Sequence, residues 1–116
     1  MGQLLFKKCF WEPIRAGTKR TTLRRWTSPR LKPGGRAFAP GVGWLRVGRV
    51  EPVDLSALGD PDARSDGFGS LDEMLTALAA LYPDHATDGK RWFRVEFSRE
   101  EDEARDPVRE VRKVQP

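Results

Sequence analysis

One segment constrains the fold more than any other, because residues 70–83 combine a start signal, an apolar stripe and a stop signal for a helix. Ser70 and Glu73 have the S-x-x-E spacing of a capping box, in which each side chain satisfies a free backbone N–H at the helix start. Pro83 ends the helix. The apolar side chains recur on one helical face, namely Leu71, Met74, Leu75, Leu78, Leu81 and Tyr82. A helix with such a face needs an apolar surface to cover.

Short β-rich segments can supply that surface. The pattern predicts strands at residues 4–11, 18–26, 36–38, 44–50 and 92–97, the fourth continuing towards Val53 with a kink at Pro52. In the last strand, Phe93, Val95 and Phe97 share one face. Residues 12–17 read as one helical turn ended by Gly17, whereas residues 27–36 and 59–69 read as loops. The chain of 116 residues is therefore expected to form one small α+β domain, with a compact β-barrel and flanking helices as one architecture, followed by a charged tail at residues 99–116.

Several classes of protein are not expected. One cysteine excludes an internal disulfide, and one cysteine with one histidine argues against a zinc site, so no metal and no cofactor is expected. Cys9 lies between apolar neighbours and is predicted to be a small core residue. No apolar run approaches the roughly 20 residues of a membrane span, and Lys7 and Lys8 interrupt any signal region, so a cytoplasmic protein without a membrane partner is expected.

The charge is distributed unevenly along the chain. Residues 1–50 contain twelve Lys or Arg and one acid, Glu12, whereas residues 51–116 contain nine bases and sixteen acids. The halves therefore carry net charges of +11 and −7. This asymmetry indicates a polyanionic partner for the first half. The alternative is that the two halves neutralise each other in the folded protein.

The basic half also contains aromatic rings that could stack on bases. Trp26 and Trp44 are the candidate stacking side chains, although core packing is the common fate of tryptophan. The cations around them can contact phosphates. The candidate nucleic-acid-binding residues are Lys19, Arg20, Arg24, Arg25, Trp26 and Arg36.

The segment after Gly17 is also a candidate for chemistry. Burial would lower the pKa of Lys19 and make it a possible base, and a nearby threonine hydroxyl could act as nucleophile. The alternative is a basic edge strand whose threonines reflect β propensity. A strand starting at Lys19 puts Thr22 on the opposite face, unless the chain bends after Gly17. Asp66 is either a partner for these bases or an ordinary turn aspartate before Gly67.

The order of these features resembles the ASCH domain family, which belongs to the PUA-like group of small β-barrels. Residues 14–25 (IRAGTKRTTLRR) are similar to the family's I-x-x-G-x-K-T-x-T-x-R segment. The turn LKPGG at residues 31–35, the strand at 44–50, the sequence DGF at 66–68 with the following helix, and the strand at 92–97 follow in the family's order. The resemblance covers about residues 3–98.

This resemblance implies a domain that binds RNA or a nucleotide through a basic cleft. Some members of the family are small amidohydrolases that deacylate modified cytidine, which is the alternative function. Carried over, Thr22 would be the nucleophile, Lys19 the base and Asp66 the group that orients Lys19. The chain departs from the family at Arg20, where the family usually has Thr, and at Asp66, where it has Glu. The resemblance also implies that Lys19 and Asp66 converge, although 47 positions separate them.

Overall fold

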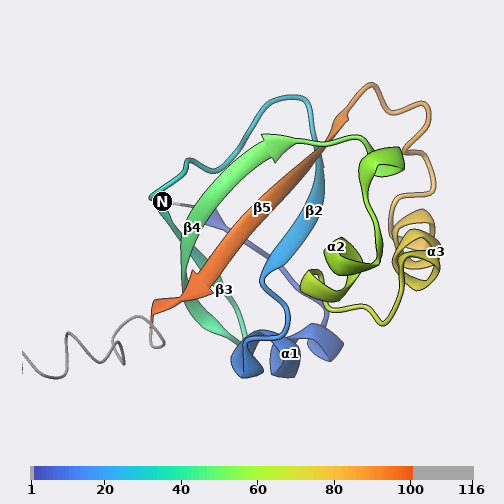
Figure 1. The fold of residues 1–116 in the computed structure, drawn as a ribbon. Helices are drawn as coiled ribbons and strands as arrows, with labels where there is room; N and C mark the ends of the chain where they lie inside the picture. The colour runs from blue at the N-terminus through green and yellow to red at the C-terminus, as the bar shows by residue number, and fades with distance from the viewer. Residues whose placement is uncertain (1, 101–116) are drawn as a thin grey trace, which may run out of the picture.

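The computed structural model describes residues 2–100 as a strongly curled sheet of five strands with short helices around it (Figure 1). The strand order is β1-β3-β4-β5-β2, and every pair is antiparallel except β1 with β3. The expected α+β class is therefore confirmed. The charged segment at residues 101–116 lies outside the described residues. The strands are β1 (Gly2–Gln3), β2 (Thr21–Trp26), β3 (Arg36–Ala39), β4 (Gly43–Pro52) and β5 (Arg91–Arg99).

The helices are short, and α3 is the longest of those described. Their bounds are η1 (Lys8–Phe10), α1 (Trp11–Ala16), η2 (Leu55–Ala57), α2 (Asp60–Ser65) and α3 (Leu71–Leu81). The α3 helix begins as predicted, because Ser70 Oγ accepts a hydrogen bond from the Glu73 N–H at 3.2 Å. The Glu73 carboxylate accepts from Gly69 N–H rather than from the cap residue itself. Gly17 ends α1 with a φ of 82°, a conformation that suits glycine.

Three predictions about the chain were wrong. Residues 4–11 do not form a strand, because β1 ends at Gln3 and the chain turns into η1 and α1. Only Leu4 of this run is deeply buried, whereas Leu5 is 64% exposed and Cys9 is exposed, so Cys9 is not a core residue. Residues 59–69 are not a continuous loop, since they contain α2. The Asp62 carboxylate caps this helix by accepting from Gly59 N–H at 2.8 Å, and six residues are too few for an apolar period to appear in the sequence.

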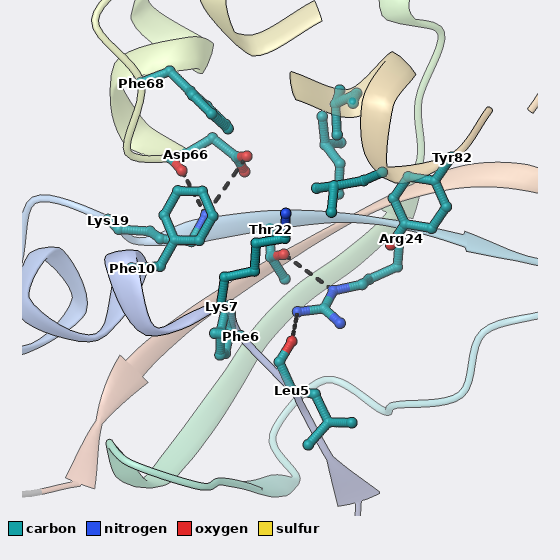
Figure 2. Close-up of a pocket in the computed structure, with 13 residues that line it drawn as sticks. Leu5, Phe6, Lys7, Phe10, Lys19, Thr22, Arg24, Asp66, Phe68 and Tyr82 are labelled. Carbon is teal, nitrogen blue, oxygen red and sulfur yellow. Dashed lines mark hydrogen bonds and ion pairs between the residues drawn. The ribbon is translucent and has the colours of Figure 1, made fainter. Parts of the chain in front are cut away.

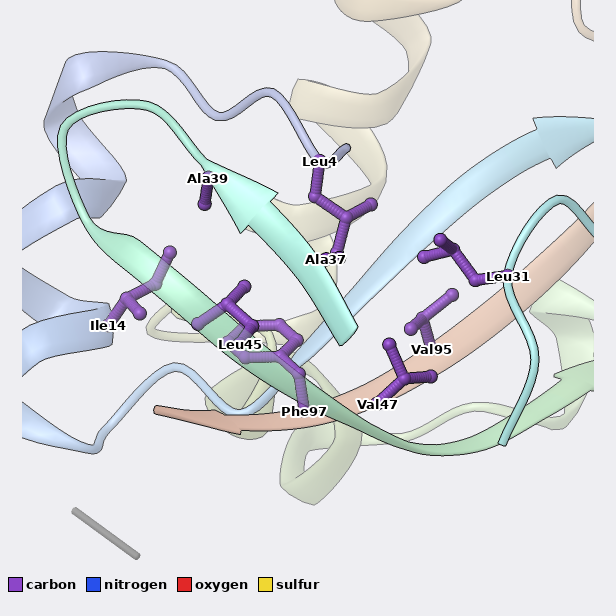
Figure 3. Packing of buried hydrophobic residues seen from close by; sticks show 9 residues of the cluster. All are labelled: Leu4, Ile14, Leu31, Ala37, Ala39, Leu45, Val47, Val95 and Phe97. Carbon is purple, nitrogen blue, oxygen red and sulfur yellow. The ribbon is translucent and has the colours of Figure 1, made fainter. Parts of the chain in front are cut away.

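The two faces of the sheet carry two separate cores. Val95 and Phe97 of β5 point into the first core with Leu45 and Val47 of β4 (Figure 3). Trp92, on the opposite face of β5, joins Leu23 of β2 in the second core, where α2 and α3 cover the sheet. The expected common face of Phe93, Val95 and Phe97 follows from this alternation. A register shift between Val47 and Val50 in the pairing of β4 with β5 accompanies the curl of the sheet.

The packing of α3 makes one residue a test of the second core. Leu78 and Met74 are the buried side chains of this helix, and Leu78 is only 4% exposed. Replacing Leu78 with Ala leaves a cavity and is expected to lower the free energy of unfolding by roughly 2–4 kcal/mol. Chemical denaturation of the two proteins measures the difference. An unchanged midpoint at constant slope would show that this face of α3 contributes nothing to the core.

Candidate functional site

A small cavity of about 110 Å³ lies where β2, α3 and the N-terminal segment meet (Figure 2). Its apolar walls come from three phenyl rings, those of Phe6, Phe10 and Phe68, and from four leucines. Its polar lining includes all three candidate catalytic residues, together with further cationic and phenolic side chains. These polar residues are Lys19, Thr22, Asp66, Lys7, Arg24 and Tyr82.

The chain path after α1 explains how Lys19 reaches this cavity. The backbone N–H groups of Thr18 and Lys19 both donate to Pro13 O, which folds the chain back over the end of α1. Arg20 N–H then donates to Ser65 O at 2.7 Å, and β2 begins only at Thr21. Because Lys19 precedes the strand, the alternation of β2 does not apply to it. Lys19 and Thr22 consequently line the same cavity, as the expected bend after Gly17 requires.

Lys19 is almost completely enclosed, with 3% of its surface exposed. Its Nζ donates hydrogen bonds to two backbone carbonyls, Asp66 O and Thr21 O, the second at 3.0 Å. The same Nζ lies 3.6 Å from Asp66 Oδ2. The predicted convergence of Lys19 and Asp66 is therefore confirmed. The alternative of a basic edge strand is right about β2, which lies at the edge of the sheet, and wrong about Lys19, which is buried rather than solvated.

Asp66 has a second partner that the sequence did not reveal. Thr21 Oγ1 donates to Asp66 Oδ1 at 3.0 Å, so the first residue of β2 holds the carboxylate in place. Gly67 follows with a φ of +95°, and a Cβ at this position would lie 3.3 Å from Cδ of Lys19. Glycine is thus required here both for the backbone conformation and for close packing against the lysine stem. Asp66 is more than an ordinary turn aspartate, since it is buried and paired.

Burial shifts the protonation of both members of this pair. Desolvation lowers the pKa of Lys19 from 10.5 to about 8, although the Asp66 carboxylate opposes the change. Desolvation likewise raises the pKa of Asp66, and Lys19 opposes that change. The ring of Phe10 lies 4.6 Å from Nζ, with those of Phe6 and Phe68 somewhat farther away. This aromatic surround favours a cation at Nζ while it excludes water.

Arg24 joins the two sides of the cavity. Its Nε donates to Thr22 Oγ1 at 3.1 Å, and its Nη2 donates to Leu5 O at 2.8 Å (Figure 2). Its guanidinium also lies 4.9 Å from the ring of Phe6. Arg24 therefore ties the N-terminal segment to β2, a role that the sequence could not reveal. Because Thr22 Oγ1 accepts this bond, its own proton is left for donation to another group, and no hydrogen bond joins Thr22 to Lys19.

The other predicted nucleic-acid-binding residues do not gather around this cavity. Arg25 ties β2 to the loop between α3 and β5 through Asp88 at 2.6 Å and through the carbonyls of His85 and Lys90. Trp26 packs against Phe93 with ring centroids 5.8 Å apart. The Trp26 ring is thus packed against the core.

Arg36 and Arg20 lie elsewhere on the molecule. Arg36 makes two hydrogen bonds to Glu100 and lies 4.2 Å from the ring of Trp44, which therefore has a cation on its face. Arg20 remains exposed beside Ser65. The six residues predicted for nucleic acid are thus spread over separate parts of the fold.

The uneven charge of the two halves is partly compensated within the fold. Acids from residues 51–100 pair with bases from residues 2–50 at five places: Lys19–Asp66, Arg25–Asp88, Arg36–Glu100, Arg46–Glu100 and Arg49–Glu96. These pairs support the alternative in which the halves neutralise each other. The charge difference alone therefore no longer indicates an extended polyanion-binding surface.

Comparisons with known proteins support the fold. No family model matches the sequence, and no curated protein matches it. The structure is similar to that of the hypothetical protein PH0355, with a TM-score of 0.67 and 18% identity over 83% of this chain and 95% of that one. It is also similar to protein EF3133 from Enterococcus faecalis V583, a DUF984 protein, with a TM-score of 0.63 and 14% identity over 84% of this chain and 79% of that one.

These similarities establish the architecture and leave the family open. The expected small PUA-like α+β barrel is confirmed as a curled half-barrel with flanking helices. Membership of the ASCH family stays a prediction from the sequence. Among residues 2–100, no helix has the length and apolar character needed to cross a membrane. The comparisons thus show a fold shared with PH0355 and EF3133.

Proposed function

We propose that the cavity binds one nucleoside unit, either free, as a nucleotide, or as a single residue of an RNA. The observation that carries this proposal is the composition of its lining. Three cationic side chains, Lys7, Lys19 and Arg24, face a single carboxylate, Asp66, among aromatic rings. Flat electron-rich rings stack on phenyl groups, and cations attract carbonyl oxygens and phosphates. A nucleobase combines a flat ring with exocyclic polar groups.

The size of the cavity supports a single ring as its occupant. Ligand pockets for larger molecules usually measure about 300–1,000 Å³, and this cavity is well below that range at about 110 Å³. A base-sized ring would fill it, while the sugar and any phosphate would remain outside. The ion pairs between the two halves of the chain argue against a long electrostatic track for RNA. Binding is therefore expected to depend on one base.

Titration with cytidine, followed by calorimetry or by NMR, tests this proposal. Replacing Phe68 with Leu removes a ring from the cavity wall and is expected to weaken binding about tenfold, within the usual worth of base–aromatic stacking. Phe38→Leu is the matched control, because this ring is 38% exposed on β3 and packs against Trp44. The proposal is wrong if nucleosides leave the resonances of the cavity residues unchanged at millimolar concentration.

A second candidate function is hydrolysis of an acylated cytidine. It is favoured by the placement of Lys19, Thr22 and Asp66 around one cavity, with the pKa of Lys19 lowered by burial to about 8. In this reaction Thr22 Oγ attacks the acyl carbon, and its proton passes to neutral Lys19, directly or through water. Lys19 then returns that proton to the departing amine as the C–N bond breaks. Water hydrolyses the acyl–threonine ester and regenerates the hydroxyl.

The missing hydrogen bond between Thr22 and Lys19 does not exclude this chemistry, because catalytic hydrogen bonds often tighten only when substrate is bound. Release of the acyl group from an acylated cytidine by the purified protein tests it. No release over a long incubation would exclude the hydrolase and leave the binding proposal standing.

A further inference from the structure

A second hollow, outside the cavity, lies between the end of α1 and α2. It is a groove of about 780 Å³, and these two helices are neighbours at the same end of the molecule (Figure 1). The backbone bond from Arg20 N–H to Ser65 O joins its two sides. Two arginines, Arg20 and Arg64, line this groove, and no acidic side chain lines it.

These two arginines lack the carboxylate partner that several other basic residues of the fold have. Arg15, Lys19, Arg25 and Arg94 all have a carboxylate within 4 Å, at distances of 2.6–3.6 Å. Within residues 2–100, Arg20 and Arg64 have no such ion pair. Arg20 is held instead by Ser65 Oγ, at 3.4 Å from Nη2. The fold thus leaves the positive charges of Arg20 and Arg64 without a carboxylate partner in one groove.

The acids close to this groove are already engaged. Glu96, which lies beside Arg20 in an adjoining hollow, pairs with Arg49 at 3.4 Å. Asp62 of α2 pairs with Arg94 at 2.7 Å, and Glu73 accepts a hydrogen bond from Gly69. An anion in the groove can therefore pair with guanidinium groups that no carboxylate already holds. Guanidinium groups bind phosphate through paired hydrogen bonds.

We infer that this groove is a phosphate site for the nucleotide whose base enters the cavity. The inference rests on the proposed function, and Phe68 connects the two places because it lines both the cavity and the groove. The phosphate can belong to a single nucleotide or to a neighbouring residue of an RNA chain. The groove would then make a nucleotide bind more tightly than a nucleoside, although the cavity itself holds only the base.

The test compares four probes: cytidine, cytidine monophosphate, a short oligocytidylate RNA and inorganic phosphate. Arg20→Gln and Arg64→Gln are each expected to weaken binding of a phosphate-bearing probe about tenfold while leaving cytidine unchanged. Both side chains are exposed, so the fold should survive, and circular dichroism checks this. Arg30→Gln is the matched control, since it removes the same charge from the exposed loop between β2 and β3. This loop lies at the opposite end of the molecule from α1 (Figure 1).

Salt dependence gives a second readout for the oligonucleotide. Two phosphate contacts predict a slope of log affinity against log salt of about −1.4, and each single substitution should halve it. Tighter binding of the monophosphate than of cytidine, abolished by either substitution, identifies the source as one nucleotide. An effect seen with the oligonucleotide alone identifies a neighbouring phosphate of a chain. Both results support the groove.

The remaining outcomes separate the groove from the cavity. If cytidine binds but Arg20→Gln and Arg64→Gln change no phosphate-bearing probe, the groove proposal is wrong and the proposed function stands. If no nucleoside binds but inorganic phosphate shifts the Nε–H resonances of Arg20 and Arg64, the proposed function fails and the phosphate site stands. If no nucleoside binds and phosphate shifts no arginine resonance, the proposed function and the groove proposal are both wrong.

Discussion

Replacing Lys19 with Met is expected to lower the free energy of unfolding by about 3 kcal/mol at neutral pH. Removing one partner of a buried ion pair typically costs about 3–5 kcal/mol, because the other charge stays buried without compensation. Here the substitution leaves Asp66 and two backbone carbonyls without the Nζ donor. Protonation of Asp66, whose pKa burial already raises, relieves part of the cost and places the effect at the low end.

Denaturant unfolding of the wild type and the variant measures this loss. The double variant Lys19→Met with Asp66→Leu is expected to recover part of the stability, since removing both charges can be neutral or stabilising. Lys90→Met removes a charge from an exposed loop and should change stability by no more than about 0.5 kcal/mol. Equal stability of the wild type and Lys19→Met would show that the buried pair contributes nothing.

The pH dependence of stability gives the same pair an independent signature. Between about pH 8 and pH 10.5, the folded protein has lost the Lys19 proton that the unfolded chain still carries. Stability therefore rises with pH across this window relative to Lys19→Met, by about 3 kcal/mol when the window is complete. Asp66 makes stability depend on pH in the acid range, with the opposite sign. Its pKa lies above 3.8 when folded, so the folded protein binds the extra proton and its stability falls as pH rises through that range.

Replacing Thr22 with Val is expected to abolish release of the acyl group, if the protein is the proposed hydrolase. The substitution keeps the shape of the side chain and removes the hydroxyl that would attack the acyl carbon. Valine also leaves Arg24 Nε without its partner, so a modest loss of stability accompanies the change. Thr22→Ser restores a hydroxyl and should recover measurable turnover. Because serine also restores the acceptor for Arg24 Nε, turnover is measured per mole of folded protein, where a loss of stability alone would leave the rate of Thr22→Val unchanged.

The pH profile of that turnover distinguishes a base from a merely structural lysine. With the pKa of Lys19 near 8, the neutral amine increases as pH rises from 7 to 9, and the rate should rise with it. Cytidine binding, by contrast, should change little on Thr22→Val. Full turnover in Thr22→Val would contradict the assignment of the nucleophile, whereas a rate independent of pH over this range would contradict the assignment of the base.

Local patterns in the sequence were sufficient for the elements that local interactions stabilise. The cap at Ser70, the apolar period of α3 and the stop at Pro83 lie within one segment, so the helix could be predicted without knowing its neighbours. The same holds for Gly17, whose left-handed conformation ends α1, and for β5, whose alternation identifies its two faces. The need of α3 for a covered face was enough to predict an α+β domain.

The tertiary structure decided the contacts that make the site. The sequence could not show that residues 5–7 form a wall of the cavity rather than a strand, because Arg24 reaches Leu5 O only after the sheet has curled. Nor could it show that Thr21 holds Asp66, a contact across 45 positions that no local period encodes. The charge difference between the halves was visible in the sequence. Whether the basic side chains face a ligand or an internal partner depends on which acidic side chains the fold brings within about 4 Å of them. Coulomb energy depends on distance and surroundings, and only the folded chain specifies either of them.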